Sequence, residues 1–486
     1  MPEAFEGDAR IERLNGHRPA AGGRRVVYWM QNAQRPNGNA ALDAAIRLGN
    51  AHGVGVVVYF GLDRAVPHAS ARTFTFLLDG LRETLADLRA RGVETLVRAE
   101  PPVEGVARLA SGLKPVAVVT DFSPLRRGRS MRAEAGARLD VPLYVVDGEH
   151  VVPVRTIGRE HWAARTIRPV IHRALPTWLV EPERVEPNHR PPALDGRLAG
   201  RRGDLLDGAI DLDRVPTAAL LESLGVDPSV PPAIDAESGP RAARARHARF
   251  IAERLTGYAT RRRESDGVGA GISPYLRYGQ VSPLRLALDV QASGAPWNDR
   301  DAYLDELIVR RELASNYCLY NRRYWTVEGL PAWARATLEK HADDPRPHVY
   351  TRDALAAAAT HDEIWNAAQR ELLVRGRIHN HVRMYWGKKI LEWSPDPAIA
   401  LASALWLNDR YGLDGRSANG FTNIAWCFGK HDRPWAERPI FGTVRYMSEN
   451  GMRAKFDVKG YVGRWGAPTD ASAPVISFDP RQPSLL

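Results

Sequence analysis

The sequence predicts an α/β domain followed by an all-helical domain, and three observations lead to this prediction. Between about residues 24 and 150, five short apolar runs alternate with amphipathic helical segments, the pattern of a doubly wound five-stranded parallel sheet. From about residue 239 onward, apolar residues recur with a helical period and no clear strand appears. The intervening stretch is rich in Pro, Gly and charge, as a long surface connector holding a few short helices would be.

The sequence predicts five strands, followed along the chain by a series of helices. The strands are predicted at residues 25–30, 54–60, 93–99, 115–122 and 141–148. After a helix that begins near residue 239, further helices are predicted at 281–293, 299–320, 363–375, 378–393 and 396–411, and a surface strap after Tyr461. We therefore divide the chain into an α/β domain (1–150), a connector (151–238) and a helical domain (239–486), since 486 residues exceed what one core supports.

Composition narrows the class of protein. Lys and Arg number 67 against 57 Asp and Glu, a net charge of +10 that fits a polyanionic partner. Only Cys318 and Cys427 are present, which argues against a disulfide framework or a zinc site, and we expect no metal. No leader pattern or membrane-length apolar run appears, so a cytoplasmic protein without a membrane partner is expected. The first strand is followed by neither GxGxxG nor a Walker loop, which disfavours ordinary dinucleotide and triphosphate sites.

A glycine-rich segment, GAGISPYLRYGQVSP (269–283), is the first candidate site. Glycines let the backbone approach a ligand, and Ser273 with Pro274 resembles a helix N-terminus, whose free amides suit a pyrophosphate. Tyr258 and Arg262 or Arg263, just upstream, could add a ring and a cation. The alternative is an ordinary loop that caps a helix.

The run from Glu363 to Trp435 is the second candidate. Trp365, Trp386 and Trp393 lie on predicted helices, and the last two are seven residues apart, so they share a face. Rings at that spacing can pass an electron, and many Lys and Arg lie nearby, which suggests redox chemistry on a nucleic acid. Core packing is the alternative, because tryptophan buries so much apolar area.

The sequence resembles the photolyase/cryptochrome family in several long motifs. ISPYLRYGQVSP is similar to its flavin-binding loop, DELIVRREL to its substrate-facing helix, and RIHNHVRMYWGKKILEW to its central flavin helix. VVYWMQNAQR, RRELASNYCLYN and FTNIAWCFGKHDRPW resemble the class II cyclobutane pyrimidine dimer photolyases. The resemblance covers about residues 24–460. It implies an α/β antenna domain, a helical domain that holds FAD, and light-driven repair of UV-damaged DNA by electron transfer to a flipped-out dimer.

The resemblance also implies roles for the residues at the reaction centre. Glu306 takes the substrate-binding carboxylate, Met384 the dimer-contacting methionine, and Trp426 the tryptophan that packs on the dimer. Asn408 takes the asparagine near the reactive flavin nitrogen, because Gly420 stands where class I members have one. An ion pair with Arg310, four residues later, is the structural alternative for Glu306. Val309 stands where class I has a pocket tryptophan, which leaves one wall open.

For the cofactor, the resemblance implies FAD, reduced and anionic in the active form. Arg383 and Asp414 match a salt bridge beside the flavin ring, where a fixed positive charge favours the anion. The other positions matched to the cofactor are Tyr258, Gly271, Ile272, Ser273 and Asn380. A second, antenna chromophore of deazaflavin, folate or flavin type is left open.

Electron transfer and DNA binding complete the implied roles. Trp386, Trp365 and Trp393 match the class II photoreduction chain from the flavin outward, and Tyr350 could extend it to the surface. Residues of the loop 430–448 could wedge into the gap left by the flipped bases, or form a solvated basic loop instead. The candidates there are Lys430, Arg433, Trp435 and Arg438.

Two other functions compete with dimer repair. A cryptochrome-type blue-light receptor is disfavoured because Glu306 and Met384 are in place and no long extension follows the helical region. Repair of (6–4) photoproducts would need a histidine acid, for which His379 and His381 are available, but the class II motifs argue against it. We expect a monomer.

Overall fold

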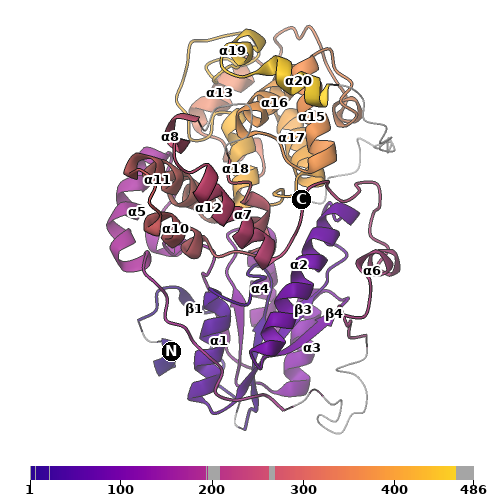
Figure 1. Ribbon diagram of the computed structural model, residues 1–486. Helices are drawn as coiled ribbons and strands as arrows, with labels where there is room; N and C mark the ends of the chain where they lie inside the picture. Colours follow the sequence, from indigo (N-terminus) through magenta and orange to yellow (C-terminus); the bar gives the residue numbers. More distant parts are fainter. Residues whose placement is uncertain are drawn as a thin grey trace.

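The computed structural model describes residues 2–5, 7–20, 22–192, 194, 208–261 and 269–466. The described chain forms an α/β part and a helical part stacked end to end (Figure 1). The sheet has six strands in the order β1-β6-β5-β2-β3-β4, all parallel except β1, which pairs antiparallel with β6. The strands are β1 (Ile11–Arg13), β2 (Arg25–Trp29), β3 (Gly55–Gly61), β4 (Glu94–Arg98), β5 (Ala117–Asp121) and β6 (Leu143–Val146).

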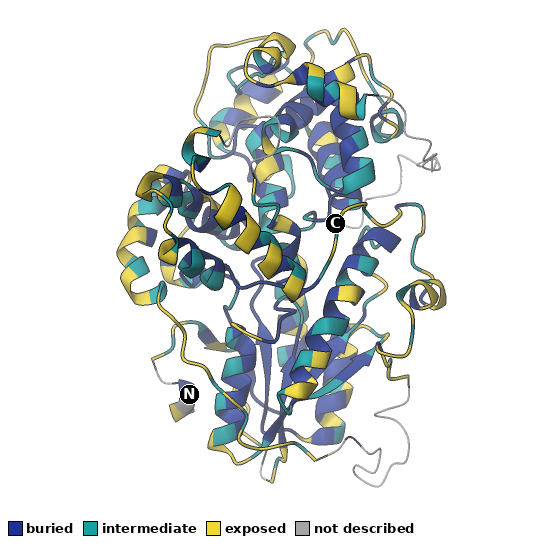
Figure 2. Ribbon diagram, viewed as in Figure 1, coloured by how far each residue is buried: buried dark blue, intermediate teal, exposed yellow. Residues whose placement is uncertain are grey.

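Helices cover both faces of the sheet. They are α1 (Ala40–Ala51), α2 (Ala71–Ala90), α3 (Pro102–Leu113) and α4 (Arg126–Arg138). Successive residues of β2 point to opposite faces: Val26 and Tyr28 pack under α1 and α2, whereas Val27 and Trp29 pack under α3 and α4. All five residues of β2 are buried, so the strands form the dark centre of the lower half in Figure 2. The predicted doubly wound α/β domain is confirmed.

The sheet differs from the prediction by one strand. The five predicted strands are present with ends shifted by a few residues, but β1 was missed. It has three residues, IER, of which only Ile11 is buried, so it carries no apolar alternation that a sequence pattern could reveal. Its register, with Ile11 opposite Val146, is fixed by pairing to the distant β6.

The helical part begins in the connector and continues to the end of the described chain. Its elements are α5 (Ala164–Trp178), α6 (Thr217–Ser223), α7 (Pro240–Glu253), α8 (Tyr258–Arg261), α9 (Ser273–Arg277), α10 (Pro283–Ala292), α11 (Trp297–Leu304), α12 (Arg311–Tyr320), α13 (Ala332–Lys340), α14 (Arg352–Ala356), α15 (Glu363–Arg375), α16 (Asn380–Trp393), α17 (Pro397–Tyr411), α18 (Ala418–Cys427), α19 (Glu449–Arg453) and α20 (Val458–Trp465). Single short turns lie at η1 (Glu3–Phe5), η2 (Val154–Ile157) and η5 (Val327–Gly329). The predicted α/β-plus-helical architecture is therefore confirmed.

Three features of the helical part depart from the expected pattern. The predicted helix 299–320 is α11 and α12 joined by a π-helical segment, η4 (Asp305–Arg310). The connector contains the 15-residue α5, which packs against η4 and is labelled in Figure 1. The expected strap after Tyr461 begins as the end of α20, and residues 467–486 lie outside the described residues. The domain boundaries stay a prediction.

Buried polar contacts join the two parts. Arg72 of α2 donates to the carbonyls of Leu372 (2.9 Å) and Tyr411 (2.8 Å), at the ends of α15 and α17. In Figure 1, α2 rises from the sheet toward these helices. Gly279 follows α9 with φ of +63°, and a Cβ there would lie 1.8 Å from the carbonyl oxygen of Asn32. Only glycine allows this approach, so the glycine-rich loop is fixed against the α/β part.

Candidate active site

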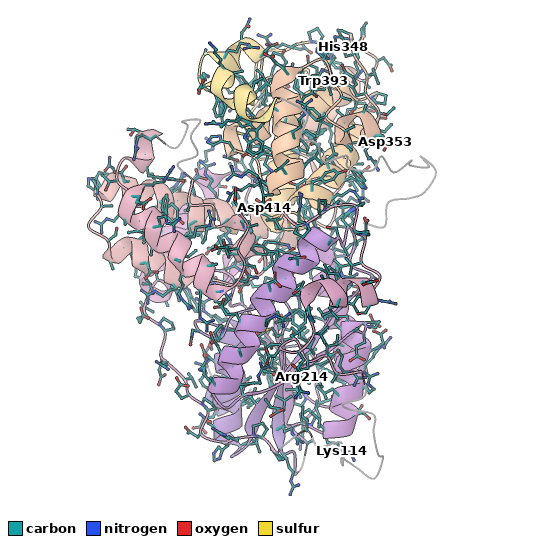
Figure 3. The ribbon with its side chains drawn as sticks, turned by 45° about the vertical axis from the view of Figure 1, so that its right-hand side comes forward. Lys114, Arg214, His348, Asp353, Trp393 and Asp414 are labelled. Atoms are coloured by element: carbon teal, nitrogen blue, oxygen red, sulfur yellow. The ribbon has the colours of Figure 1, made fainter. Side chains whose placement is uncertain are left out.

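The centre of the candidate site is an ion pair between α16 and the loop after α17. Both terminal nitrogens of Arg383 bind the carboxylate of Asp414, at 3.0 and 2.9 Å. Burial alone would raise the pKa of Asp414, but the charge and hydrogen bonds of Arg383 hold that pKa below its ordinary value. Conversely, burial disfavours the charged guanidinium, yet Asp414 keeps the pKa of Arg383 above its ordinary value. A positive charge is thus fixed where Figure 3 places Asp414, at the inner end of the helical part.

Asn408 of α17 joins this pair. Arg383 donates to the Oδ1 of Asn408, and the Nδ2 of Asn408 donates to Asp409 at 2.9 Å. A Cβ on Gly420 would lie 3.0 Å from that same Nδ2, closer than most side-chain contacts. Because residue 420 is glycine, there is space for the amide of Asn408. This is the arrangement expected if Asn408 takes the role of the asparagine that class I members have at the position of Gly420.

The glycine-rich loop lies against two guanidinium groups. Gly271 has φ of +62°, and a Cβ there would lie 2.9 Å from Arg246 and 3.5 Å from Arg377. Burial and then the neighbouring charges of Arg375 and Arg246 lower the pKa of Arg377. Like charges held together beside a positive-φ glycine are suited to a diphosphate, which would relieve their repulsion. Sequence reasoning missed Arg246, because α7 reads only as a generally basic helix.

Two other loop residues adjoin this centre. Ser273 hydrogen-bonds the carboxylate of Asp414 and so links the loop to the ion pair. Its helix, α9, has five residues, so its dipole contributes less than a longer helix would. Ile272 is buried as the N-cap of α9, with its side chain in the core.

The remaining positions matched to the cofactor are spread around the loop. Tyr258 is buried in an aromatic cluster, edge-on to Phe250 (5.7 Å) and Tyr303 (5.5 Å). Asn380 is exposed at the first turn of α16, one turn before Arg383. Arg262 and Arg263 lie outside the described residues.

The three tryptophans form one contiguous row. Trp386 is one turn beyond Arg383 on α16, and its ring stacks on Trp365 of α15 at 6.1 Å and 4°. Trp365 then meets Trp393 edge-on at 5.8 Å, and Trp393 meets Tyr350 at 5.5 Å. Trp386 and Trp393 alone are two helical turns, about 10 Å, apart along the axis, so Trp365 bridges a gap that the heptad spacing leaves open.

All three indoles are also core residues. Trp386 donates to the side chain of Gln369 and Trp365 to the backbone carbonyl of Trp386, both at 3.0 Å. Each is at most 3% exposed. The core alternative and the electron-transfer hypothesis are thus compatible, because a rigid core also fixes ring spacing.

The candidate substrate carboxylate lies on the π-helical segment. Glu306 is exposed, between buried packing residues such as Val309. Arg310 makes its ion pair with Asp305, at 3.3 Å and five residues back, as the wider π-helical turn favours. Arg310, the partner considered for Glu306, is thus already engaged by Asp305. π-Helical segments occur frequently at functional sites.

Met384 and Trp426 lie beside α16 and α18. Met384 is half-buried one residue after Arg383, and its carbonyl oxygen is 3.8 Å from the thiol of Cys427. Two cations lie near the ring of Trp426, Lys388 at 5.0 Å and Arg445 at 5.5 Å from its centre. Burial lowers the pKa of Lys388 to about 8.

The basic loop after α18 divides into an exposed and a buried part. Arg433, Trp435 and Arg438 are exposed, and Trp435, at 39%, is the ring that Arg433 covers at 4.9 Å and Arg445 at 4.1 Å. Lys430 differs from the expectation. It is 5% exposed, pairs with Glu160 and lies 4.3 Å above the ring of Tyr317, so its charge is not offered to an external phosphate.

A cleft of about 560 Å³ lies between the two parts of the chain. It opens beside the residues that follow β2 and β6, and segment 181–185 and α10 form its other walls. Asp43 and several arginines line it, and burial raises the pKa of Asp43 to about 6. Sequence reasoning did not locate this cleft, because its walls come from seven stretches of the chain that lie far apart in sequence.

A family model described as DNA photolyase matches residues 26–192. A deoxyribodipyrimidine photo-lyase of Methanothermobacter thermautotrophicus is 40% identical over 457 residues, covering 94% of this chain and 97% of that protein. This chain belongs to the photolyase/cryptochrome family. A deoxyribodipyrimidine photo-lyase of Arabidopsis thaliana is 35% identical and covers 90% of this chain and 88% of its own.

Solved structures of the family share the fold. A Synechocystis cryptochrome matches with a TM-score of 0.71 at 14% identity, covering 93% of this chain and 89% of its own. An archaeal photolyase of Sulfolobus tokodaii, solved with two FAD molecules, matches with a TM-score of 0.66 at 15% identity, covering 91% and 90%. Within the part of the chain that the structure describes, no helix has the length and apolarity to cross a bilayer.

Proposed function

We propose that this protein is a class II photolyase that repairs cyclobutane pyrimidine dimers in DNA with light. The observation that carries the proposal is the Arg383–Asp414–Asn408 centre at the inner end of a continuous row of indoles. Curated relatives named deoxyribodipyrimidine photo-lyase, aligned over most of this chain, support it. The likeness to a cryptochrome concerns the fold alone and does not favour a receptor.

The residues of the site fit FAD, the cofactor of this family. Arg246, Arg377 and Gly271 would hold its diphosphate, since two crowded cations meet there at a backbone that only glycine adopts easily. Arg383 would lie beside the flavin ring, where its fixed charge favours an anionic reduced state. When bound, light-excited reduced FAD supplies the electron that opens the cyclobutane ring and receives it back. Asp414 keeps Arg383 charged and oriented throughout.

The substrate side is formed by α16, α18 and η4. Glu306 would hydrogen-bond the dimer and stabilise the extra electron on it, and Met384 and Trp426 would contact its rings. Lys388 and Arg445 both lie against the ring of Trp426, which would fix it as a stacking surface for the dimer. The dimer must leave the duplex to reach such a pocket, at a cost reduced because damaged bases stack poorly.

The exposed part of the basic loop is proposed to hold the DNA. Arg433 and Arg438 would neutralise phosphates, and Trp435, positioned by Arg445, would fill the gap left by the flipped bases. Lys430 would act indirectly, by fixing the start of the loop to Glu160.

The cleft between the two parts is proposed to hold the antenna chromophore. It opens beside the carboxyl end of β2, which lies between β3 and β5 at the switch point of the sheet, where ligands of doubly wound folds bind. Its size, its arginines and the half-buried carboxyl of Asp43 suit an anionic heteroaromatic ligand with ring N–H donors. The chemical type of this chromophore, the monomeric state and the cytoplasmic location stay predictions.

The class II assignment is supported by two features of the site. The indole row follows the order Trp386, Trp365, Trp393 across α16 and α15. Asn408 occupies the space above Gly420. Neither feature depends on the overall fold, which other classes of the family share.

Glu306→Ala tests the proposed repair role. The protein is first reduced chemically, so that photoreduction cannot limit the result, and the dimers split per absorbed photon are counted on a thymine-dimer oligonucleotide. The yield should fall severalfold, with the flavin spectrum unchanged and DNA affinity only modestly weaker, because a contact that strengthens as charge develops acts on the chemical step.

Asp305→Ala is the matched control. Asp305 is on the same π-helical segment but pairs with Arg168 and Arg310, so its removal disturbs the local fold without removing the substrate carboxylate. Its yield should stay near that of the unaltered protein. An undiminished yield in Glu306→Ala would refute the substrate role and weaken repair as the function.

A further inference from the structure

The outer end of the indole row is a hydrogen-bonded pair, Tyr350 and His361. The phenol oxygen of Tyr350 lies 2.7 Å from the Nδ1 of His361, and it accepts the backbone N–H of the same histidine at 3.0 Å. Both rings contact Trp393, at 5.5 Å for Tyr350 and 5.1 Å for His361. Figure 3 places Trp393 near the outer end of the helical part and Asp414 at its inner end.

The geometry points Tyr350 at a proton acceptor. Its oxygen already accepts the backbone N–H, which leaves its own O–H to donate to the Nδ1 of His361. Partial burial and then the adjacent ring of His348, stacked 3.8 Å away, lower the pKa of His361. The imidazole is therefore neutral near pH 7, the state that accepts a proton.

We propose that His361 makes Tyr350 a proton-coupled terminal electron donor. In this step Tyr350 gives one electron to the oxidised indole of Trp393, and its phenol proton moves to the Nδ1 of His361. The products are neutral Trp393, a neutral tyrosyl radical and a protonated His361, so charge and protons balance. The inference rests on the proposed function, which supplies the oxidant: photoexcited oxidised flavin, acting through the indole row.

The proton acceptor is what makes this step favourable. A phenol holds its proton with a pKa of about 10, whereas an oxidised phenol releases it readily, so electron loss is easy only where a base can take the proton at once. Moving the positive charge from Trp393 to the exposed His361 also removes the charge that would draw the electron back. The separated state then lasts long enough for an external reductant to reach Tyr350.

The charges around His361 favour this role. Lys389 pairs with Glu392 at 2.7 Å, so these two largely cancel. The carboxylate of Asp362 accepts the buried phenol of Tyr385 and the amide of Trp365. The remaining neighbour is His348, whose ring stacks on that of His361. As pH falls through the lowered pKa of His361, the acceptor becomes protonated and the tyrosyl yield should decrease.

The test is flash spectroscopy on the flavin-loaded protein with its flavin oxidised. Transient absorption and electron paramagnetic resonance measure how many flashes end in a tyrosyl radical, separately from repair activity. His361→Phe keeps a ring against Trp393 but removes the base, and it should lower the tyrosyl yield by at least about tenfold. His361→Asn, which can accept a hydrogen bond but not a proton, should behave the same way.

His348→Phe is the matched control, since it preserves the stacked ring and leaves the Tyr350–His361 hydrogen bond intact. Its tyrosyl yield should stay within about twofold of the unaltered protein, and its loss at low pH should persist. Native circular dichroism and flavin content verify that each variant is folded. Tryptophan radicals followed by a tyrosyl radical that is independent of His361, or by none at all, would overturn this inference alone. Absence of tryptophan radicals in the unaltered protein would overturn the proposed electron-transfer chain as well.

Discussion

Asp414→Ala should destabilise the protein strongly, because it removes the carboxylate that pairs with the buried charge of Arg383 and leaves only the neutral amide of Asn408 beside it. The two side chains are 12% and 16% exposed and share two hydrogen bonds. Removing one member of such a buried pair costs about 3–5 kcal/mol. For a helical region of this size, that corresponds to a fall in melting temperature of roughly 6–20 °C. The assay is a thermal melt followed by circular dichroism and by flavin release.

A surface pair provides the control. Glu134 and Arg138 of α4 form an i, i+4 ion pair whose side chains are 45% and 44% exposed. Glu134→Ala should shift the melt by no more than about 1 kcal/mol in equivalent free energy, because solvent screens the pair. A similar shift for both variants would mean that Arg383 is solvated, and that the site holds no fixed buried charge.

Removing both partners separates the structural role of the pair from its chemical role. Arg383→Met combined with Asp414→Leu removes the unpaired charge and fills similar volume, and such replacements of buried ion pairs are often neutral or stabilising. The melting temperature should therefore recover most of the loss. The flavin should lose its preference for an anionic reduced state, seen in its absorption spectrum, because the fixed positive charge is gone. Recovery of both properties would refute the proposed role of Arg383.

Two further predictions concern the neighbouring site and the DNA surface. Gly420→Asn should displace the amide of Asn408, since even a Cβ at 420 lies 3.0 Å from it, and the flavin spectrum should change more than it does for Gly463→Asn, whose Cβ would meet no atom within 4 Å. Identical spectra for the two variants would show that Asn408 lies away from the flavin. Arg438→Ala should reduce the slope of log affinity against log salt by about 1, as expected for one lost phosphate contact. An unchanged slope would remove Arg438 from the DNA surface.

Much of the site could be predicted because its residues are close together in sequence. Trp386 and Trp393 share a helical face by spacing alone, and Arg383 lies one turn before Trp386 on that helix. The bridging ring, Trp365, is on another helix, and only the resemblance to a known family placed it between them. The strands were predicted for a similar reason, since fully buried parallel strands appear as continuous apolar runs.

What the sequence could not predict depends on contacts between distant segments. Lys430 looked like a phosphate contact, but its partner, Glu160, precedes it by 270 residues. In the sequence, Arg246 is one of several cations of α7, and only the fold brings it beside Gly271 and Arg377. β1 forms because its backbone pairs with the edge of β6, which is more than 120 residues away in sequence. In each case the side chain or strand has no local pattern that distinguishes it.

The two ends of the indole row have different electrostatic roles in the proposed mechanism, and both ends lie on α16. Near Arg383, the proposed function needs a fixed charge beside the cofactor, and the ion pair with Asp414 would provide it. At its other end, α16 finishes at Trp393, close to the surface. There the positive charge on the oxidised indole should be removed, and the Tyr350–His361 pair would accept it by moving the phenol proton to His361. In the proposed mechanism, an electron that moves inward along the row is drawn to the charge of Arg383. The positive charge left behind then moves outward to His361, which can release a proton to water. The residues near the two ends of α16, Arg383 at one and Trp393 with its neighbours Tyr350 and His361 at the other, would together keep the separated charges apart.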